Sequence, residues 1–194
     1  MHNYLISYNC YHGTTSKNSN IIITNKEFTY EYREDHWLGN GVYFFIEDEM
    51  KGKWWARNAV KKEKRLTNET HEPVVIYIMV NVERRNLLNL NTEEGQKILK
   101  EFNKFLKDNK KGIVIEKRAG ETEVSKKRRA LCTLLDLLST SLDFKASCYL
   151  FGGSNIPNLF RLEGDYGLSN NNGNQLCVYD SSILDFNTYE EITV

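Results

Sequence analysis

The chain has 194 residues, and its 26 Lys and Arg residues are balanced by 26 Asp and Glu residues, so the formal net charge is zero. Nonspecific affinity for nucleic acids depends on a surplus of cationic side chains, so this balance argues against a bulk polyanion binder. Hydrophobic residues make up 40% of the chain, which excludes a disordered polypeptide. At roughly 150 residues per domain, we expect one domain over residues 1–194.

The sequence shows no sign of a membrane segment or of a metal site. The longest apolar run, Val74–Val80, is much shorter than the ~20 residues of a transmembrane helix, and no signal peptide is visible. We therefore expect a cytoplasmic protein with no membrane partner. The four cysteines lack the usual zinc spacings, so we expect no metal and reduced thiols that fill the core. They are Cys10, Cys132, Cys148 and Cys177.

The N-terminal part of the chain mixes one clear strand signal with ambiguous segments. Leu5–Tyr11 is short and rich in apolar and aromatic residues, which predicts a strand. We expect a turn at His12–Thr15 and a polar loop at Ser16–Asn20. Ile21–Tyr32 fits either a short strand or a helix. Gly and Asn in Trp37–Gly41 predict a turn.

The central part alternates strand and helix signals. Val42–Ile46 predicts a strand, Asp48–Leu66 predicts a helix, and the β-branched run Val74–Val82 predicts a buried strand. Asn91 with Glu94 three residues later resembles a capping box, so we expect a helix to begin there. The apolar residues that follow at helical spacing are Ile98, Leu99, Phe102, Phe105 and Leu106.

The C-terminal part begins with a further predicted helix, Val124–Leu142, whose leucines lie on one face. Short strand-like runs follow at Cys148–Phe151, Leu159–Leu162 and Gln175–Tyr179, with a loop at Asn170–Asn174. Strands thus occur at both ends of the chain, with helices between them. Since this is not the regular alternation of a parallel sheet, we predict a mixed α+β fold.

Charge is distributed unevenly along the balanced chain. Lys51–Arg65 holds seven Lys and Arg residues against one Glu, and Lys117–Arg129 holds six against two. Solvated helix faces are the simpler interpretation. The alternative is a basic rim that receives phosphates from a dinucleotide or an RNA.

Three short segments carry candidate chemistry: Tyr11–Thr14, Gly39–Phe44 and Asn174–Asp180. Each alone is weak, because a histidine at a strand end or a tyrosine in an apolar strand is usually structural. Together they resemble the three motifs of the ADP-ribosyltransferases of the diphtheria-toxin and poly(ADP-ribose) polymerase type, which carry a His-Tyr-Glu triad on three β segments. The resemblance is closer still to a group of small, poorly described bacterial proteins of that superfamily. It rests on Trp37–Phe45 and Gln175–Val178.

This resemblance implies a fold and a co-substrate. The fold would be a split β core of two small, mostly antiparallel sheets with flanking helices, and NAD+ would bind between them. His12 would hold the adenosine ribose, the Gly13 backbone would contact the nicotinamide carboxamide, and Thr14 would be a further NAD+-binding residue. Tyr43 would stack on the nicotinamide ring, and Trp54, next to Trp55, would cover its other face.

Gln175 occupies the third position of the triad, where the polymerases have Glu. An amide can hydrogen-bond the nicotinamide ribose, but it cannot accept a proton as a base. The resemblance therefore implies transfer of a single ADP-ribose unit to a macromolecular acceptor, protein or RNA/DNA, by a toxin or phage-defence effector that an antitoxin could control. A catalytically weak module that binds NAD or ADP-ribose is the alternative. There is no P-loop and no third glycine after Gly39 and Gly41, so a Rossmann site is not expected.

Overall fold

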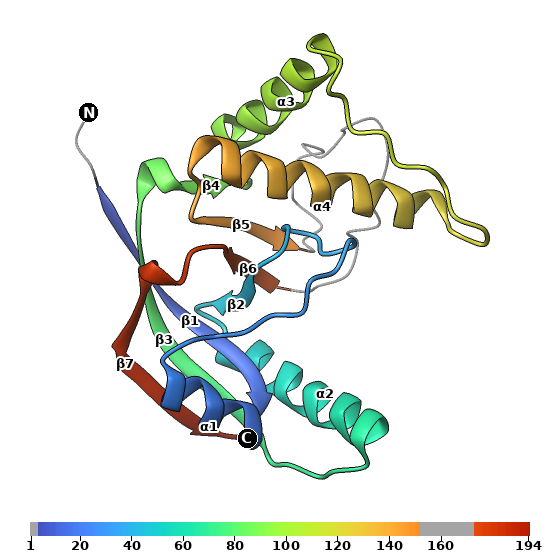
Figure 1. The fold of residues 1–194 in the computed structure, drawn as a ribbon. Coiled ribbons are helices and arrows are strands. Elements are labelled where there is room, and N and C mark those ends of the chain that lie inside the picture. Colours follow the sequence, from blue (N-terminus) through green and yellow to red (C-terminus); the bar gives the residue numbers. More distant parts are fainter. Residues whose placement is uncertain (1–3, 152–172) are drawn as a thin grey trace.

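The computed structural model describes residues 4–151 and 173–194 as one mixed sheet flanked by four helices, which confirms the predicted α+β class. Figure 1 shows the sheet running through the middle, with α3 and α4 together at one end and α1 and α2 at the other. The sheet order is β4-β5-β6-β2-β1-β3-β7. The strands are β1 (Leu5–Thr15), β2 (Val42–Ile46), β3 (Pro73–Glu83), β4 (Leu87–Asn89), β5 (Ala146–Phe151), β6 (Gly173–Val178) and β7 (Leu184–Thr193).

Each α-helix begins at a side chain that accepts a hydrogen bond from a backbone N–H of the first turn. These N-caps are Thr15, Asp48, Thr92 and Thr122, and all belong to the residue types that favour this position. The α-helices are α1 (Ser16–Asn25), α2 (Glu49–Thr67), α3 (Glu93–Asp108) and α4 (Glu123–Leu142), and two short 3-10 helices are Arg84–Asn86 and Ser181–Ile183. Among the helices of residues 4–151 and 173–194, none combines the length and apolarity that a bilayer span requires.

The sheet is continuous but unevenly joined. β1 pairs with β3 along its whole length, from Leu5 opposite Glu83 to Thr15 opposite Pro73. Its other neighbour, β2, pairs with it at only two positions, Cys10 opposite Ile46 and Tyr11 opposite Phe45. The pairing of β4 with β5 is parallel, and the other strand pairs are antiparallel. The expected two separate sheets are therefore not confirmed, because this short junction joins all seven strands.

The hydrophobic core lies on both faces of the sheet. One cluster includes Cys10, Phe44 and Ile76 and receives Ile22 of α1. The second cluster packs α3 and α4 against β4, β5 and β6, with Leu135 of α4 fully buried. All four cysteines are reduced and buried, as the sequence predicts.

The turn predicted at His12–Thr15 and the loop predicted at Ser16–Asn20 are both wrong. β1 continues to Thr15 because β3 offers it a partner at every residue, and Thr15 then caps α1. Of the polar residues that suggested a loop, Lys17, Asn18 and Asn20 are exposed on α1, whereas Ser19 is buried. Long-range pairing thus overrides a local turn signal here.

The start of α3 also differs from the prediction by one residue. Thr92 is the N-cap, whereas the side-chain oxygen of Asn91 accepts a hydrogen bond from the backbone N–H of Leu150 at 2.8 Å. Phe105, expected on the apolar face, is exposed. The predicted run Leu159–Leu162 lies outside the described residues, as do residues 170–172 of the predicted loop.

Candidate functional site

A cavity of about 180 Å³ lies on one face of the sheet, between α2 and α4. Residues directly opposite each other on paired strands share a face, so Tyr11, Phe45 and Gln175 point to the same side. Alternation along each strand adds Gly13 and Tyr43 to that side. The lining residues are Gly13, Arg33, Asp35, His36, Trp37, Tyr43, Phe44, Phe45, Trp55, Arg128 and Gln175.

Tyr43 lies in this lining and also closes the turn that precedes β2. Its hydroxyl accepts a hydrogen bond from the Leu38 N–H at 2.8 Å and donates one to the Gly39 carbonyl at 2.9 Å. Burial raises the pKa of Tyr43 well above its usual value, so the hydroxyl stays protonated. The His36 ring packs at 5.4 Å from the Tyr43 ring, centroid to centroid. The two hydroxyl hydrogen bonds and the neighbouring His36 ring together position the Tyr43 ring.

Asp136 of α4 binds the Gly39–Gly41 turn through hydrogen bonds. The Asp136 carboxylate accepts hydrogen bonds from the Asn40 backbone N–H at 2.7 Å and from the Asn40 side-chain amide at 2.8 Å. Gly39 has φ of +81°, a conformation that favours glycine. At Gly41 an added Cβ would lie 2.4 Å from the Val178 carbonyl oxygen of β6. The spacing of the motif thus fits a turn pressed between β6 and α4.

Gln175 is held in place by Trp37. The indole N–H of Trp37 donates a hydrogen bond to the side-chain oxygen of Gln175 at 3.0 Å, and Gln175 is only 3% exposed. The Arg128 guanidinium lies 5.6 Å from the Trp37 ring centroid, a cation–π contact. Motif residues from near opposite ends of the chain therefore meet through a direct contact.

His12 lies next to Tyr43 but is not among the residues that line the cavity. Its Nδ1 is 2.8 Å from the Tyr43 carbonyl oxygen, and because a carbonyl only accepts, Nδ1 carries the proton. The ring packs edge-on against Phe28 at 5.3 Å. Burial lowers the pKa of His12 below 6.5, so the ring is neutral and its Nε2 is an acceptor.

Gly13 lines the cavity and also allows α2 to pack on β1. A Cβ at this position would lie 2.3 Å from the Gly52 carbonyl oxygen and 2.5 Å from the Ala56 nitrogen, closer than real contacts allow. The absence of a side chain therefore has a packing reason as well as the expected functional one. Thr14 is buried and lies outside the lining.

The paired tryptophans of α2 have different positions. Trp55 lines the cavity, and its ring lies 6.4 Å from that of Phe45. Trp54, which the family spacing favours, is half exposed and is not part of the lining, although its ring lies 5.8 Å from Trp55.

Sequence reasoning missed four polar residues of the lining: Arg33, Asp35, His36 and Arg128. Arg33 and Asp35 form an ion pair at 3.0 Å. The Nε2 of His36 is buried and has no hydrogen-bond partner in the described part of the chain, and burial lowers the pKa of His36. His36 directly precedes the Trp-Leu-Gly motif and Arg128 lies in the second basic segment, so their place in the sequence was the available signal.

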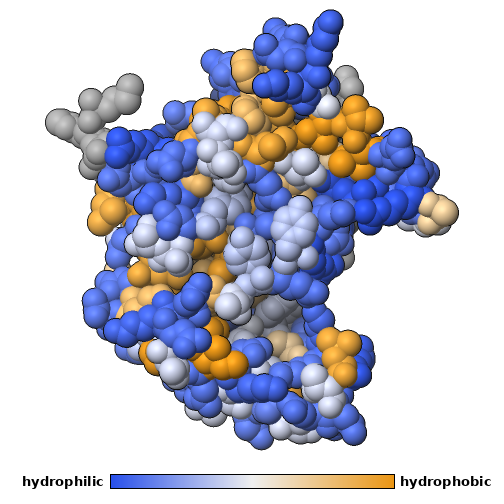
Figure 2. Space-filling model, viewed as in Figure 1, coloured by the Kyte–Doolittle hydropathy of each residue, from blue (hydrophilic) through white to orange (hydrophobic). Residues whose placement is uncertain are grey.

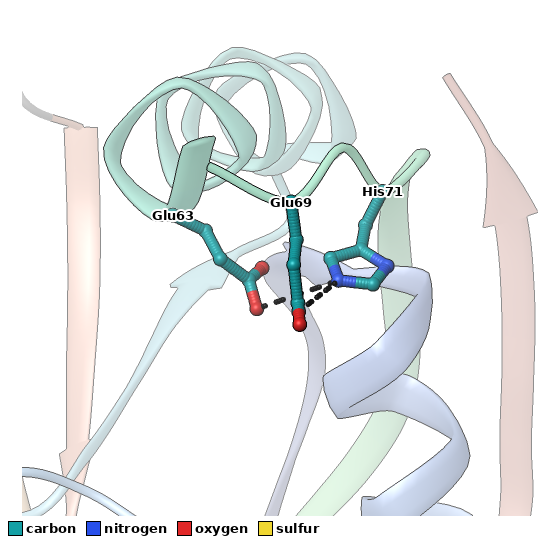
Figure 3. A group of neighbouring side chains, drawn as sticks. All are labelled: Glu63, Glu69 and His71. Carbon is teal, nitrogen blue, oxygen red and sulfur yellow. Dashed lines mark hydrogen bonds and ion pairs between the residues drawn. The ribbon is translucent and has the colours of Figure 1, made fainter. Parts of the chain in front are cut away.

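A separate group of possible ligand atoms lies at the end of α2. Glu63, Glu69 and His71 place one ligand atom each within 4.8 Å of one another (Figure 3). The same Glu69 oxygen already accepts from Lys17 at 2.8 Å and lies 3.1 Å from His71 Nε2. With an ammonium group on that oxygen, the arrangement is an ion-pair cluster that ties α1 to the connection between α2 and β3.

Comparison with known proteins leaves the family open. No family model matches the sequence. An uncharacterized protein of Methanocaldococcus jannaschii is 39% identical over 57 residues, which is 29% of this chain. The chain spans about a quarter of that relative's length.

Proposed function

We propose that this protein is an NAD+-dependent mono-ADP-ribosyltransferase. The observation that carries the proposal is the convergence of the three sequence motifs: Gly13, Tyr43 and Gln175 all line one cavity. The cavity is smaller than the ~300 Å³ at which drug-sized pockets begin. It therefore suits the nicotinamide end of the dinucleotide, and the rest would lie along the adjoining surface.

The chemistry assigns a role to each of these residues. The bond between nicotinamide and ribose C1′ breaks, and nicotinamide leaves with the bonding electron pair. An acceptor oxygen or nitrogen then bonds to C1′ and loses its proton. Tyr43 stacks on the nicotinamide ring from within the cavity, and Trp55 replaces Trp54 as the aromatic residue near its other side. The Gln175 amide hydrogen-bonds the nicotinamide ribose, and His12 Nε2 accepts a hydrogen bond from a hydroxyl of the adenosine ribose.

The short junction between β1 and β2 supports the same proposal. Beyond Tyr11 and Phe45 the two strands are no longer paired, so Gly13 has no β2 partner. We interpret the sheet as two halves, β4-β5-β6-β2 and β1-β3-β7, that diverge at this point. An unpaired stretch of strand offers backbone groups that a carboxamide could bond.

A second candidate function is a binding module for NAD or ADP-ribose without turnover. It is favoured by the hydrogen bond from Trp37 to Gln175, which already uses one of the two acceptor positions of the amide oxygen. Release of nicotinamide separates the two functions, because binding alone leaves NAD+ intact.

In its biological role we propose a cytoplasmic toxin or phage-defence effector that modifies a macromolecule and has an antitoxin or immunity partner. Expression of the active chain without that partner should then arrest the growth of the host cells. Growth arrest that persists when Gln175 is replaced by Ala would contradict this role.

The test measures nicotinamide release from NAD+ and transfer of labelled ADP-ribose in a cell extract. Gln175→Ala should reduce turnover at least 100-fold while NAD+ affinity changes little, because the ribose contact tightens in the transition state. Gln175→Glu should retain NAD+ hydrolysis, since a carboxylate can stabilise the cationic ribose.

Gln96→Ala is the matched control for this experiment. Gln96 is also a buried glutamine, and its amide donates to the Leu90 carbonyl at 3.0 Å, away from the cavity lining. It should keep parental turnover. Parental turnover in Gln175→Ala would remove the third motif from the site, and absence of nicotinamide release from the parent would favour the binding module.

A further inference from the structure

The two basic segments of the sequence, Lys51–Arg65 and Lys117–Arg129, differ in the ion pairs and the exposure of their side chains. In Lys117–Arg129 three of the six cations pair with carboxylates: Lys117 with Glu123 at 2.8 Å, Arg118 with Glu34, and Arg129 with Glu121 at 2.8 Å. The other three, Lys126, Lys127 and Arg128, are only partly exposed, and Arg128 lies over the Trp37 ring in the cavity lining.

α2 differs from this segment because most of its cations are exposed. Arg57, Lys61, Lys64 and Arg65 are exposed, and none of them forms an ion pair with any residue that the structure describes. Residues 57, 61 and 64 recur at helical spacing, so their side chains lie on one face, with Arg65 beside them. We call these four residues the α2 stripe. In Figure 2 the part of the molecule that holds α2 in Figure 1 mixes blue hydrophilic atoms with orange and white ones.

Trp54 extends the α2 stripe toward the cavity. It precedes Arg57 by three residues, which puts it on the same face, and it is 50% exposed. A large exposed indole in line with unpaired cations offers a stacking platform beside phosphate-binding charges. Its ring lies 5.8 Å from Trp55, which lines the cavity.

We propose that Trp54 and the α2 stripe bind a single-stranded nucleic acid, which is the acceptor of the ADP-ribose. This inference rests on the proposed function. From Trp54 to Lys64 the helix rises about 15 Å, which matches roughly four phosphates at the ~3.4 Å spacing of a stacked strand. A base that stacks on Trp54 leaves its neighbour at the cavity. A single strand supplies a phosphate and a stackable base in every nucleotide, so it can use the cations and the indole together.

The test measures fluorescence anisotropy of 5′-labelled single-stranded RNA and DNA 12-mers in the absence of NAD+, from 50 to 200 mM salt. Four phosphate contacts predict a slope of about −3 for the logarithm of affinity against the logarithm of salt. Arg57→Gln/Lys61→Gln/Lys64→Gln should weaken binding at least tenfold and flatten the slope to about −1. Trp54→Ala should weaken binding about tenfold with the slope unchanged.

The matched control is Lys100→Gln/Lys104→Gln/Lys107→Gln, which removes the same charge from exposed positions of α3, at the opposite end of the molecule in Figure 1. It should bind like the parent. Equal weakening by both triple variants, or equal affinity of the parent for poly-glutamate of the same charge, would overturn the inference.

The same assays distinguish this inference from the proposed function. Parent protein that releases nicotinamide but binds neither 12-mer would overturn the nucleic-acid acceptor alone. Parent protein that binds the 12-mers through the α2 stripe but releases no nicotinamide would overturn the transferase alone. Label that resists nuclease and yields to protease in the extract experiment would also overturn the nucleic-acid acceptor.

Discussion

Tyr43 combines two tasks that substitution can separate. Its ring lines the cavity, and its hydroxyl bonds two backbone groups of the preceding turn. Tyr43→Phe keeps the ring but leaves the Leu38 N–H and the Gly39 carbonyl without this partner. We expect the free energy of unfolding to fall by about 1–3 kcal/mol, with NAD+ turnover per folded molecule largely kept. Tyr43→Ala, which also removes the ring, should lose about 100-fold in turnover.

Urea unfolding followed by circular dichroism, with nicotinamide release measured alongside, checks both expectations. Tyr77→Phe is the control, because its hydroxyl donates to a side chain, Asn9, at 2.9 Å rather than to a turn. It should cost less stability. Full activity in folded Tyr43→Ala would show that the ring does not contact the substrate.

His12 predicts a pH dependence of stability. Burial lowers its pKa in the folded protein below 6.5, so the unfolded chain binds the proton first as the pH falls. The neutral ring therefore supports the fold fully above pH 6.5, and this contribution declines below that pH with a slope of at most about 1.4 kcal/mol per pH unit. His12→Gln should flatten the decline just below pH 6.5, measured by urea titrations across that range. His71→Gln, which leaves His12 in place, should keep it.

For single residues, the sequence predicts some members of the cavity lining but not the neighbours that surround them. The resemblance of three motifs to a known family points to Gly13, Tyr43 and Gln175, which meet in the cavity. It does not identify Arg128 or His36, because their approach depends on how α4 and the turn before β2 pack together. The choice of Trp54 over Trp55 depended on counting residues, and a shift of one residue on a helix turns a side chain by about 100°.

At the scale of elements, the contact between α2 and β1 depends on a position without a side chain. Gly13→Ala would place a methyl group 2.3 Å from the Gly52 carbonyl oxygen, where only backbone could yield. We expect a loss of about 1–3 kcal/mol in the free energy of unfolding. Gly112→Ala is the control, since its nearest neighbour would be the Lys107 side chain at 3.5 Å. Equal unfolding midpoints for the two variants would show that α2 shifts without cost.

The sequence predicts those helices and strands whose own residue pattern is enough to define them. α2 and β3 match their predicted spans closely, because a long run without Pro and a β-branched run are local signals. β4 and β7 were not predicted. β4 has only three residues, and β7 alternates weakly, with exposed acidic residues at the sheet edge. Their partners, β5 and β3, create them through backbone pairing.

The whole molecule should unfold as one unit. The cluster that holds Cys10 extends beneath both halves of the sheet, from Ile76 of β3 to Cys148 of β5. Burial raises the pKa of Cys148 to about 12, so its thiol is both inaccessible and protonated. We expect a thiol reagent to label none of the four cysteines in the native protein and all four in a single phase after urea unfolding. Two phases would mean that the halves open separately.

The tryptophans have a practical consequence for spectroscopy. The chain has three, at positions 37, 54 and 55. Two of them line the cavity, and the third lies beside it. Nearly all of the intrinsic fluorescence above 320 nm should therefore come from the cavity and its immediate surroundings, because the chain has no tryptophan elsewhere. Emission intensity and wavelength then report occupancy of this region directly, so that ligands can be titrated against the unlabelled chain.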